Sequence, residues 1–185
     1  MRRIGIHLSY WQEKWSDDLL PLIHKAHQAG FEVAEFPLLF PHSLDYLSLR
    51  SCLDDLEMAA SCGTGLAAET DITHPDGLIR KAGLAHLQAC IEGAARLGSP
   101  VLAGLTYAGW GVFPADGKVE RRRQCIESLK IVDRMASDHG ITVCLEVVNR
   151  FEGYLINTVD QGLVLLAELS CSNIKLHLDT FHMNI

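Results

Sequence analysis

Short apolar runs alternate with longer amphipathic stretches along the chain. Apolar runs of about five to seven residues are typical of strands that are buried on both faces of a parallel sheet. We assign strands to residues 4–8, 31–36, 64–68, 100–105, 141–147 and 174–178. Between them, apolar positions recur at helical spacing. This spacing predicts helices over residues 17–29, 43–62, 76–97, 120–139 and 158–169.

Glycines mark the boundaries between these elements. Each of four glycines follows a helical pattern and precedes a strand pattern: Gly30, Gly63, Gly98 and Gly140. Glycine just past a helix end adopts the left-handed conformation at little cost, so each is predicted to end a helix. The last helix is expected to begin at a capping box formed by Thr158 and Gln161.

The strand and helix unit recurs six times, about every 30–40 residues, which predicts an α/β fold with a parallel sheet. No Gly-x-Gly-x-x-Gly motif follows a strand, so the pattern does not favour a dinucleotide-binding fold. A TIM (β/α)8-type barrel fits better, but a typical barrel has eight strands in about 250 residues. We therefore expect residues 1–185 to form a single incomplete barrel domain, C-terminally truncated, with six βα units.

Composition narrows the possible partners. The chain has 185 residues, of which 48% are hydrophobic and 21% charged, as in ordinary globular domains. Its net charge of −7 argues against binding to nucleic acid or to an anionic membrane, because phosphate binding needs a basic surface. The one basic run, residues 121–123, lies beside Glu120 and Glu127 and is interpreted as a solvated helix face. No apolar stretch reaches the ~18 residues of a membrane span.

The cysteines and most histidines look structural. No two of the six cysteines have the C-x-x-C spacing, and most lie among apolar residues. We expect reduced thiols in a cytoplasmic protein rather than a zinc site. Four histidines fall on predicted helices and are expected at the surface: His24, His27, His86 and His139.

Polar residues cluster where the predicted strands end, which is where barrel enzymes carry their chemistry. The residues at these positions are His7, Glu35, Glu69, Thr106, Glu146 and Asp179. Carboxylates are seldom buried unless they are paired. Glu146 and Asp179, followed by Glu152 and His182, predict a divalent metal site. Carboxylate and imidazole ligands favour Mn²⁺, Mg²⁺ or Co²⁺, and such an ion stabilises an enediolate beside a carbonyl.

Two segments resemble the signature of the ketose 3-epimerases, the D-tagatose and D-psicose 3-epimerases of the xylose isomerase-like TIM-barrel superfamily. They are residues 146–152 (EVVNRFE) and 178–185 (LDTFHMNI). Residues 9–11 with 15–16, and 103–106 with Trp110, are similar to that family's first and fourth strand-end loops. The resemblance implies inversion of C3 of a free ketohexose through a cis-enediolate. The expected pairs are D-fructose with D-psicose and D-tagatose with D-sorbose, with Mn²⁺ foremost and Co²⁺ or Mg²⁺ as alternatives.

The resemblance also implies roles for individual residues. Glu146 is expected to be a metal ligand and one of two catalytic acid/base groups, and Asp179 a second ligand. Glu152 and His182 are expected to hold the C1 and C2 end of the sugar. The further substrate-binding candidates are His7, Trp11, Gly104 and Trp110. The family's remaining ligands, a histidine on strand seven and a glutamate on strand eight, would lie beyond Ile185. We expect a homo-oligomer, a dimer or a tetramer.

The sequence departs from the family pattern at two positions, and two alternative functions stay open. His7 stands where the family usually has an aromatic residue, and is either part of the substrate wall or a buried histidine bonded to a carbonyl. Glu69 stands where the family has small or apolar residues, so the resemblance does not determine the preferred ketose. One alternative is an aldose–ketose isomerase of the same superfamily. The other is an inactive fragment that associates with partner chains through its open strand edges.

Overall fold

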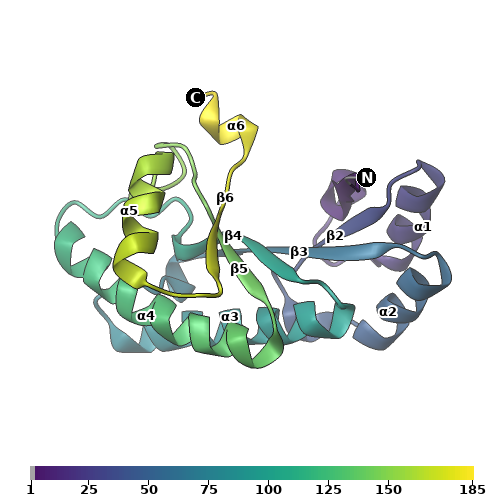
Figure 1. Cartoon of the computed structure of the whole chain (residues 1–185), viewed down its shortest axis with the longest axis horizontal. Coiled ribbons are helices and arrows are strands. Elements are labelled where there is room, and N and C mark those ends of the chain that lie inside the picture. The colour runs from purple at the N-terminus through teal and green to yellow at the C-terminus, as the bar shows by residue number, and fades with distance from the viewer. Residues whose placement is uncertain (1–2) are drawn as a thin grey trace.

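The computed structural model describes residues 3–185 and contains one parallel sheet of six strands (Figure 1). The strands lie in chain order, so each pairs with the one before it. They are β1 (Gly5–His7), β2 (Val33–Pro37), β3 (Ala59–Leu66), β4 (Val101–Gly109), β5 (Thr142–Glu146) and β6 (Ile174–His177). Parallel neighbours need a crossover connection between them. The α/β fold with six βα units is therefore confirmed.

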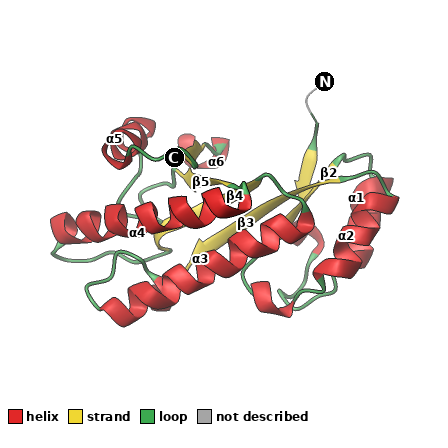
Figure 2. Cartoon of the chain, turned by 60° about the horizontal axis from the view of Figure 1, so that its bottom comes forward, coloured by secondary structure: helices red, strands yellow, loops and turns green. Residues whose placement is uncertain are grey.

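The long helices lie on one face of this sheet (Figure 2). They are α1 (Leu20–Gln28), α2 (Tyr46–Asp55), α3 (Gly77–Leu97), α4 (Lys118–His139) and α5 (Val159–Leu169). The shorter helices are η1 (Leu8–Trp11), η2 (Pro41–Ser43), η3 (Ala68–Thr70) and α6 (Thr180–Met183). The short helices follow strands β1, β2, β3 and β6, and so lie at the end of the sheet where polar residues were expected.

Alternation along the strands separates the core from the site. In β3, every second residue is buried, and Cys62 and Leu66 belong to the hydrophobic core. In β5, the buried Val143 and Leu145 alternate with residues that are partly exposed, the last of which is Glu146. Because successive side chains point to opposite faces of a sheet, one face packs against the helices and the other is free to carry polar groups.

The helix predicted over residues 43–62 is wrong in its second half. Helix α2 ends at Asp55, Glu57 takes a left-handed backbone conformation, and β3 already begins at Ala59. Gly63, expected at a helix end, instead lies inside β3, whereas Gly30, Gly98 and Gly140 have positive φ angles as predicted. Short apolar runs suit a helix or a strand equally well, and here pairing with β2 decides.

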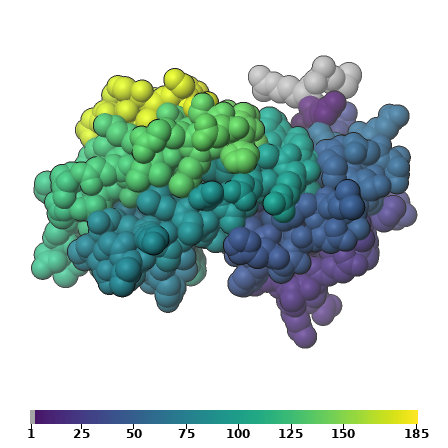
Figure 3. All heavy atoms as spheres, turned by 90° about the horizontal axis from the view of Figure 1, so that it is seen from below, coloured from purple at the N-terminus to yellow at the C-terminus, as the bar shows by residue number. Residues whose placement is uncertain are grey.

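Strands β1 and β6 each have a single neighbour in the described chain, β2 and β5 respectively. Figure 3 shows the N-terminal part (purple) and the C-terminal part (yellow) well apart on the surface. None of the helices in residues 3–185 combines the length and the apolar character that a membrane crossing requires. The six cysteines are free thiols.

Candidate metal and sugar site

The ends of β5 and β6 bring two carboxylates together. Glu146 is the last residue of β5 and pairs in register with His177, the last residue of β6. Asp179 follows two residues later and caps the N-terminus of α6, where its Oδ1 accepts the Phe181 N–H at 2.8 Å. One ligand atom from each of Glu146, Asp179 and His182 can be chosen so that all lie within 4.8 Å of one another. The two carboxylates are donors that a hard divalent cation prefers.

Glu146 has an environment suited to a base. Its side chain is 17% exposed, and its Oε1 lies 3.3 Å from Nε2 of His182. Burial raises the pKa of Glu146, and the nearby His177 and His182 partly oppose that rise. A carboxylate with a raised pKa accepts a proton more readily than an ordinary surface glutamate does.

The orientation of His182 follows from the neighbouring Asn149. Asn149 is 4% exposed, and its Oδ1 accepts the Phe151 N–H at 2.9 Å, so its Nδ2 is the donor atom. That Nδ2 lies 2.8 Å from Glu152 Oε1 and 2.9 Å from Nδ1 of His182. Nδ1 must therefore accept, which leaves the proton of a neutral His182 on Nε2. In this tautomer His182 presents an N–H donor towards Glu146 and the cavity.

Glu152 is held by two loops. The indole N–H of Trp110, in the loop after β4, donates to Glu152 Oε2 at 3.0 Å. A backbone hydrogen bond joins the same two loops, because the Gly111 N–H donates to the Glu152 carbonyl at 2.9 Å. These bonds from Trp110 and Asn149 lower the pKa of Glu152. Glu152 is thus fixed as a hydrogen-bond acceptor beside His182.

Replacing Trp110 with phenylalanine tests this link. The substitution keeps an aromatic ring but removes the indole donor, so the pKa of Glu152 is expected to rise towards its ordinary value. The lowered pKa stabilises the fold above the unfolded-state pKa, and this gain is lost as pH falls through the folded-state value. The variant should therefore lose less stability on acidification than the wild type. An NMR titration of the glutamate carboxyl carbons measures the shift; an unchanged pKa would contradict the assignment.

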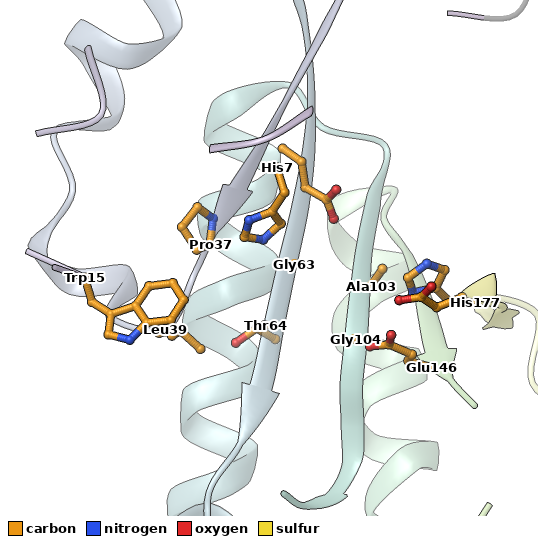
Figure 4. Close-up of a pocket in the computed structure, with 12 residues that line it drawn as sticks. His7, Trp15, Pro37, Leu39, Gly63, Thr64, Ala103, Gly104, Glu146 and His177 are labelled. Carbon is orange, nitrogen blue, oxygen red and sulfur yellow. The ribbon is translucent and has the colours of Figure 1, made fainter. Parts of the chain in front are cut away.

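Two adjoining cavities open at this site. One, of about 450 Å³, is lined by Glu146, His177 and Asp179 on one side and by His7 and Glu35 on the other. Figure 4 shows His7 and Pro37 on one side of β3 and Ala103, Glu146 and His177 on the other. The second cavity, of about 800 Å³, is lined by Glu152, His182, Trp110 and the loop after β3, including Glu69. Four residues line both: Trp15, Leu39, Thr64 and Glu146.

The two tryptophans that follow β1 have different surroundings. Trp15 lines both cavities, whereas Trp11 lines neither and instead packs against Tyr10 and below Lys25, whose Nζ is 5.1 Å from the indole centre. The 3-10 helix η1 turns the chain directly after β1, which carries Trp11 towards α1. Of the two, only Trp15 lines the cavities, and a contact between Trp11 and the sugar stays a prediction.

Gly104 is required where β3 and β4 approach closely. Its φ angle is +118°, and a Cβ built there would lie 2.0 Å from the Thr64 carbonyl oxygen. Any side chain at this position would force the two strands apart beside the cavity. Thr106, the candidate predicted at the end of this strand, is fully buried and lines neither cavity.

Some residues of the site were not anticipated. His177 lines the smaller cavity, and its Nδ1 is buried without a hydrogen-bond partner in the described chain. It lies two residues before Asp179, and strand alternation could have placed both on the same face. His86, expected at the surface, is partly buried, with Nε2 3.0 Å from the hydroxyl of Thr64 behind the cavity wall. No pattern in the sequence signals that contact.

A buried ion pair fastens the outer loops of the site. Asp71, after β3, is fully buried, and its Oδ2 lies 3.1 Å from Nη1 of Arg121 in α4. Its Oδ1 accepts from the hydroxyl of Thr73, which in turn lies 3.0 Å from the hydroxyl of Tyr154. The interpretation of Arg121 as a solvated residue is wrong. This network ties the loop after β3 to the loop that carries Glu152.

Comparison with known proteins agrees with this geometry. Residues 23–185 match the model of the family described as xylose isomerase-like TIM barrel. The chain belongs to this family. It is 33% identical to the D-psicose 3-epimerase of Ruminiclostridium cellulolyticum and 35% identical to the ketose 3-epimerase of Arthrobacter globiformis, over 98% and 99% of its length. The crystal structure of the Methylomonas sp. D-allulose 3-epimerase in complex with D-allulose superimposes on it with a TM-score of 0.93 at 33% identity, covering all of this chain and 65% of that one.

These relatives confirm the resemblance to ketose 3-epimerases and the barrel architecture. The chain spans 64% of the length of each of the two curated relatives. The matched part includes β5, β6 and the loops that carry Glu146, Glu152, Asp179 and His182.

Proposed function

We propose that the protein to which this chain contributes is a metal-dependent ketose 3-epimerase that acts on free ketohexoses. One observation carries the proposal: the carboxylate of Glu146 faces a cavity beside Asp179 and the N–H donor of His182. The similarity to proteins named D-psicose and ketose 3-epimerase supports the choice of reaction. The proposed substrates are D-psicose with D-fructose and D-tagatose with D-sorbose.

The residues present fit a divalent cation. In the described chain Glu146 and Asp179 supply carboxylate oxygens, and we assign both as ligands. The tautomer of His182 keeps its Nε2 protonated, which suits a donor to a sugar oxygen better than a ligand. When bound, the cation stabilises negative charge on the sugar oxygens next to the reacting carbon. We propose Mn²⁺ as this cation, with Co²⁺ and Mg²⁺ as alternatives that fit the same donors.

Each of the chain's own site residues has a separate role in the proposed reaction. Glu146 removes the proton from C3, and the electron pair of the broken C–H bond moves towards the C2 carbonyl to give the cis-enediolate. His182 and Glu152 hold oxygens at the C1 and C2 end, as donor and acceptor respectively, and Trp110 keeps Glu152 in place. A second acid must return a proton to the opposite face of C3, and the family resemblance assigns that role to a glutamate on an eighth strand.

The reaction is tested by NMR in D₂O. The complete protein to which this chain contributes, purified with Mn²⁺, is expected to convert D-psicose into D-fructose and D-tagatose into D-sorbose, with deuterium appearing at C3. Removal of the metal with a chelator should stop the exchange, and Mn²⁺ should restore it. No C3 exchange with any of these ketoses would refute the proposal. Deuterium at C1 or C2 with formation of an aldose would favour the aldose–ketose isomerase instead.

The proposal also covers the oligomeric state of the enzyme and its compartment in the cell. We propose a homo-oligomer, a dimer or tetramer, located in the cytoplasm. The free thiols of all six cysteines are consistent with a reducing compartment. Light scattering after size-exclusion chromatography measures the oligomeric state directly.

A further inference from the structure

Glu146 has a second histidine neighbour, on the adjacent strand. Glu146 of β5 and His177 of β6 pair in register, so their Cα atoms lie about 5 Å apart. Both side chains line the smaller cavity, whereas Leu145 belongs to the core and Leu176 packs against it. Glu146 and His177 therefore extend from the same face of the sheet, and Figure 4 shows their side chains next to each other.

The fold gives the ring of His177 no obvious structural role. Its Nδ1 is buried and makes no hydrogen bond within residues 3–185. The next pair on this face, two residues earlier in each strand, is Cys144 with Lys175, which offers no carboxylate. A buried polar atom without a partner destabilises a fold. Packing alone therefore does not account for a histidine at this position.

His177 lies beside the candidate ligands without being one of them. Among the described residues, the side chains whose ligand atoms lie within 4.8 Å of one another are Glu146, Asp179 and His182, and His177 is not in this group. It nevertheless acts on Glu146. Burial raises the pKa of that carboxyl, and among the charged neighbours His177 opposes the rise most strongly. The imidazole is thus a close neighbour of the carboxylate from outside the ligand group.

A carboxylate that serves as both ligand and base has to be held in one orientation. The last torsion of a glutamate side chain has only a broad preference, so the carboxylate of Glu146 rotates at little cost unless it is held. Its Oε1 lies 3.3 Å from Nε2 of His182, which comes from α6. A second hydrogen bond, from the neighbouring strand, would stop the rotation. Groups behind metal ligands commonly orient them in this way.

We propose that His177 is a positioning residue that hydrogen-bonds the carboxylate of Glu146 and, together with His182, fixes its orientation towards the cation and C3. The inference rests on the proposed function for the roles of Glu146 as ligand and base. It gives His177 a part in the reaction without contact with the sugar.

Mn²⁺ binding to the complete protein tests this role separately from turnover. His177→Phe keeps a ring and removes both nitrogens. Calorimetry is expected to show about 10- to 100-fold weaker Mn²⁺ binding, the usual effect of losing a group that orients a ligand. At saturating Mn²⁺, kcat for C3 exchange should fall, whereas KM for D-psicose should stay nearly unchanged because His177 does not touch the sugar.

Further variants distinguish a hydrogen bond from packing. His177→Asn places an amide near the position of Nδ1, and His177→Gln places one near that of Nε2, so at least one of them should bind Mn²⁺ more tightly than His177→Phe does. Circular dichroism checks that each variant folds. If the phenyl ring is not accommodated, His177→Leu makes the same test with a smaller side chain.

A matched control is available on α1. His27→Phe makes the same chemical change at an exposed histidine outside both cavities, and should alter neither Mn²⁺ affinity nor kcat. Wild-type Mn²⁺ affinity in His177→Phe, or the failure of both amide variants to improve on it, would overturn the positioning role.

The outcomes also separate this inference from the epimerase proposal. If the wild-type protein shows no C3 exchange but loses Mn²⁺ affinity in His177→Phe and regains it with an amide, the epimerase proposal fails and the positioning of Glu146 stands. If the wild-type protein exchanges C3 and His177→Phe binds Mn²⁺ normally, the epimerase proposal stands and the role of His177 fails.

Discussion

Replacing Glu146 with glutamine is expected to reduce C3 exchange by about 100- to 10,000-fold, the usual contribution of a general base. Glutamine has nearly the same shape, but its amide cannot accept the C3 proton, and it presents a neutral oxygen where a carboxylate ligand stood. Mn²⁺ should therefore bind more weakly as well. NMR in D₂O measures the exchange, and calorimetry on the purified chain measures Mn²⁺ binding separately.

A matched variant controls for the loss of a carboxylate in general. Glu57→Gln makes the same chemical change at an exposed position outside both cavities, and should alter neither exchange nor Mn²⁺ affinity. A Glu146→Gln variant that exchanges C3 within tenfold of the wild type would show that another group is the base. Unchanged Mn²⁺ affinity would remove Glu146 from the proposed ligands.

The largest effect on stability is expected at Asp71. Asp71→Ala removes the partner of Arg121, whose side chain is only 15% exposed, and deletes the acceptor of two bonds from Thr73. Breaking a buried ion pair from one side leaves an uncompensated charge and costs about 3–5 kcal/mol. That is a large part of the total free energy of unfolding of an ordinary domain, about 5–15 kcal/mol. Urea denaturation followed by circular dichroism measures the loss.

The chain offers a matched control for this prediction. Asp54 pairs with Arg50 four residues earlier on α2, and its side chain is 63% exposed. Asp54→Ala should destabilise the protein much less than Asp71→Ala does, because water screens an exposed pair. If the two substitutions destabilise the protein equally, burial does not strengthen the Asp71–Arg121 pair, and the link between the loops after β3 and β5 is weaker than described.

The repeating architecture and the main site residues could be predicted because their signals are local. A carboxylate that directly follows an apolar run, as Glu146 and Asp179 do, marks the C-terminal end of a strand. Barrel enzymes carry their functional residues at that end. His177 has the same local signal through strand alternation, although it is absent from the predicted site residues. The positions that sequence reasoning placed correctly are those whose environment is set by the strand on which they lie.

The sequence predictions are wrong at positions whose environment is set by residues far away in the chain. Arg121 looked solvated because its acidic neighbours on α4 were visible, whereas its partner Asp71 lies fifty residues earlier in the chain. The division between α2 and β3 depends on pairing with β2, which a short apolar run does not reveal. Trp11 and Trp15 are indistinguishable by residue type, and only the turn of η1 determines which of them reaches the cavity.

The order of the strands has a consequence for how the molecule is made. Each strand pairs with the one synthesised just before it, so the sheet can grow from β1 to β6 as the chain leaves the ribosome. Among the six described strands, every βα unit after the first finds its docking edge already in place. At each stage, however, the newest strand presents an unpaired edge, which makes the nascent chain most prone to aggregation just before its next unit arrives.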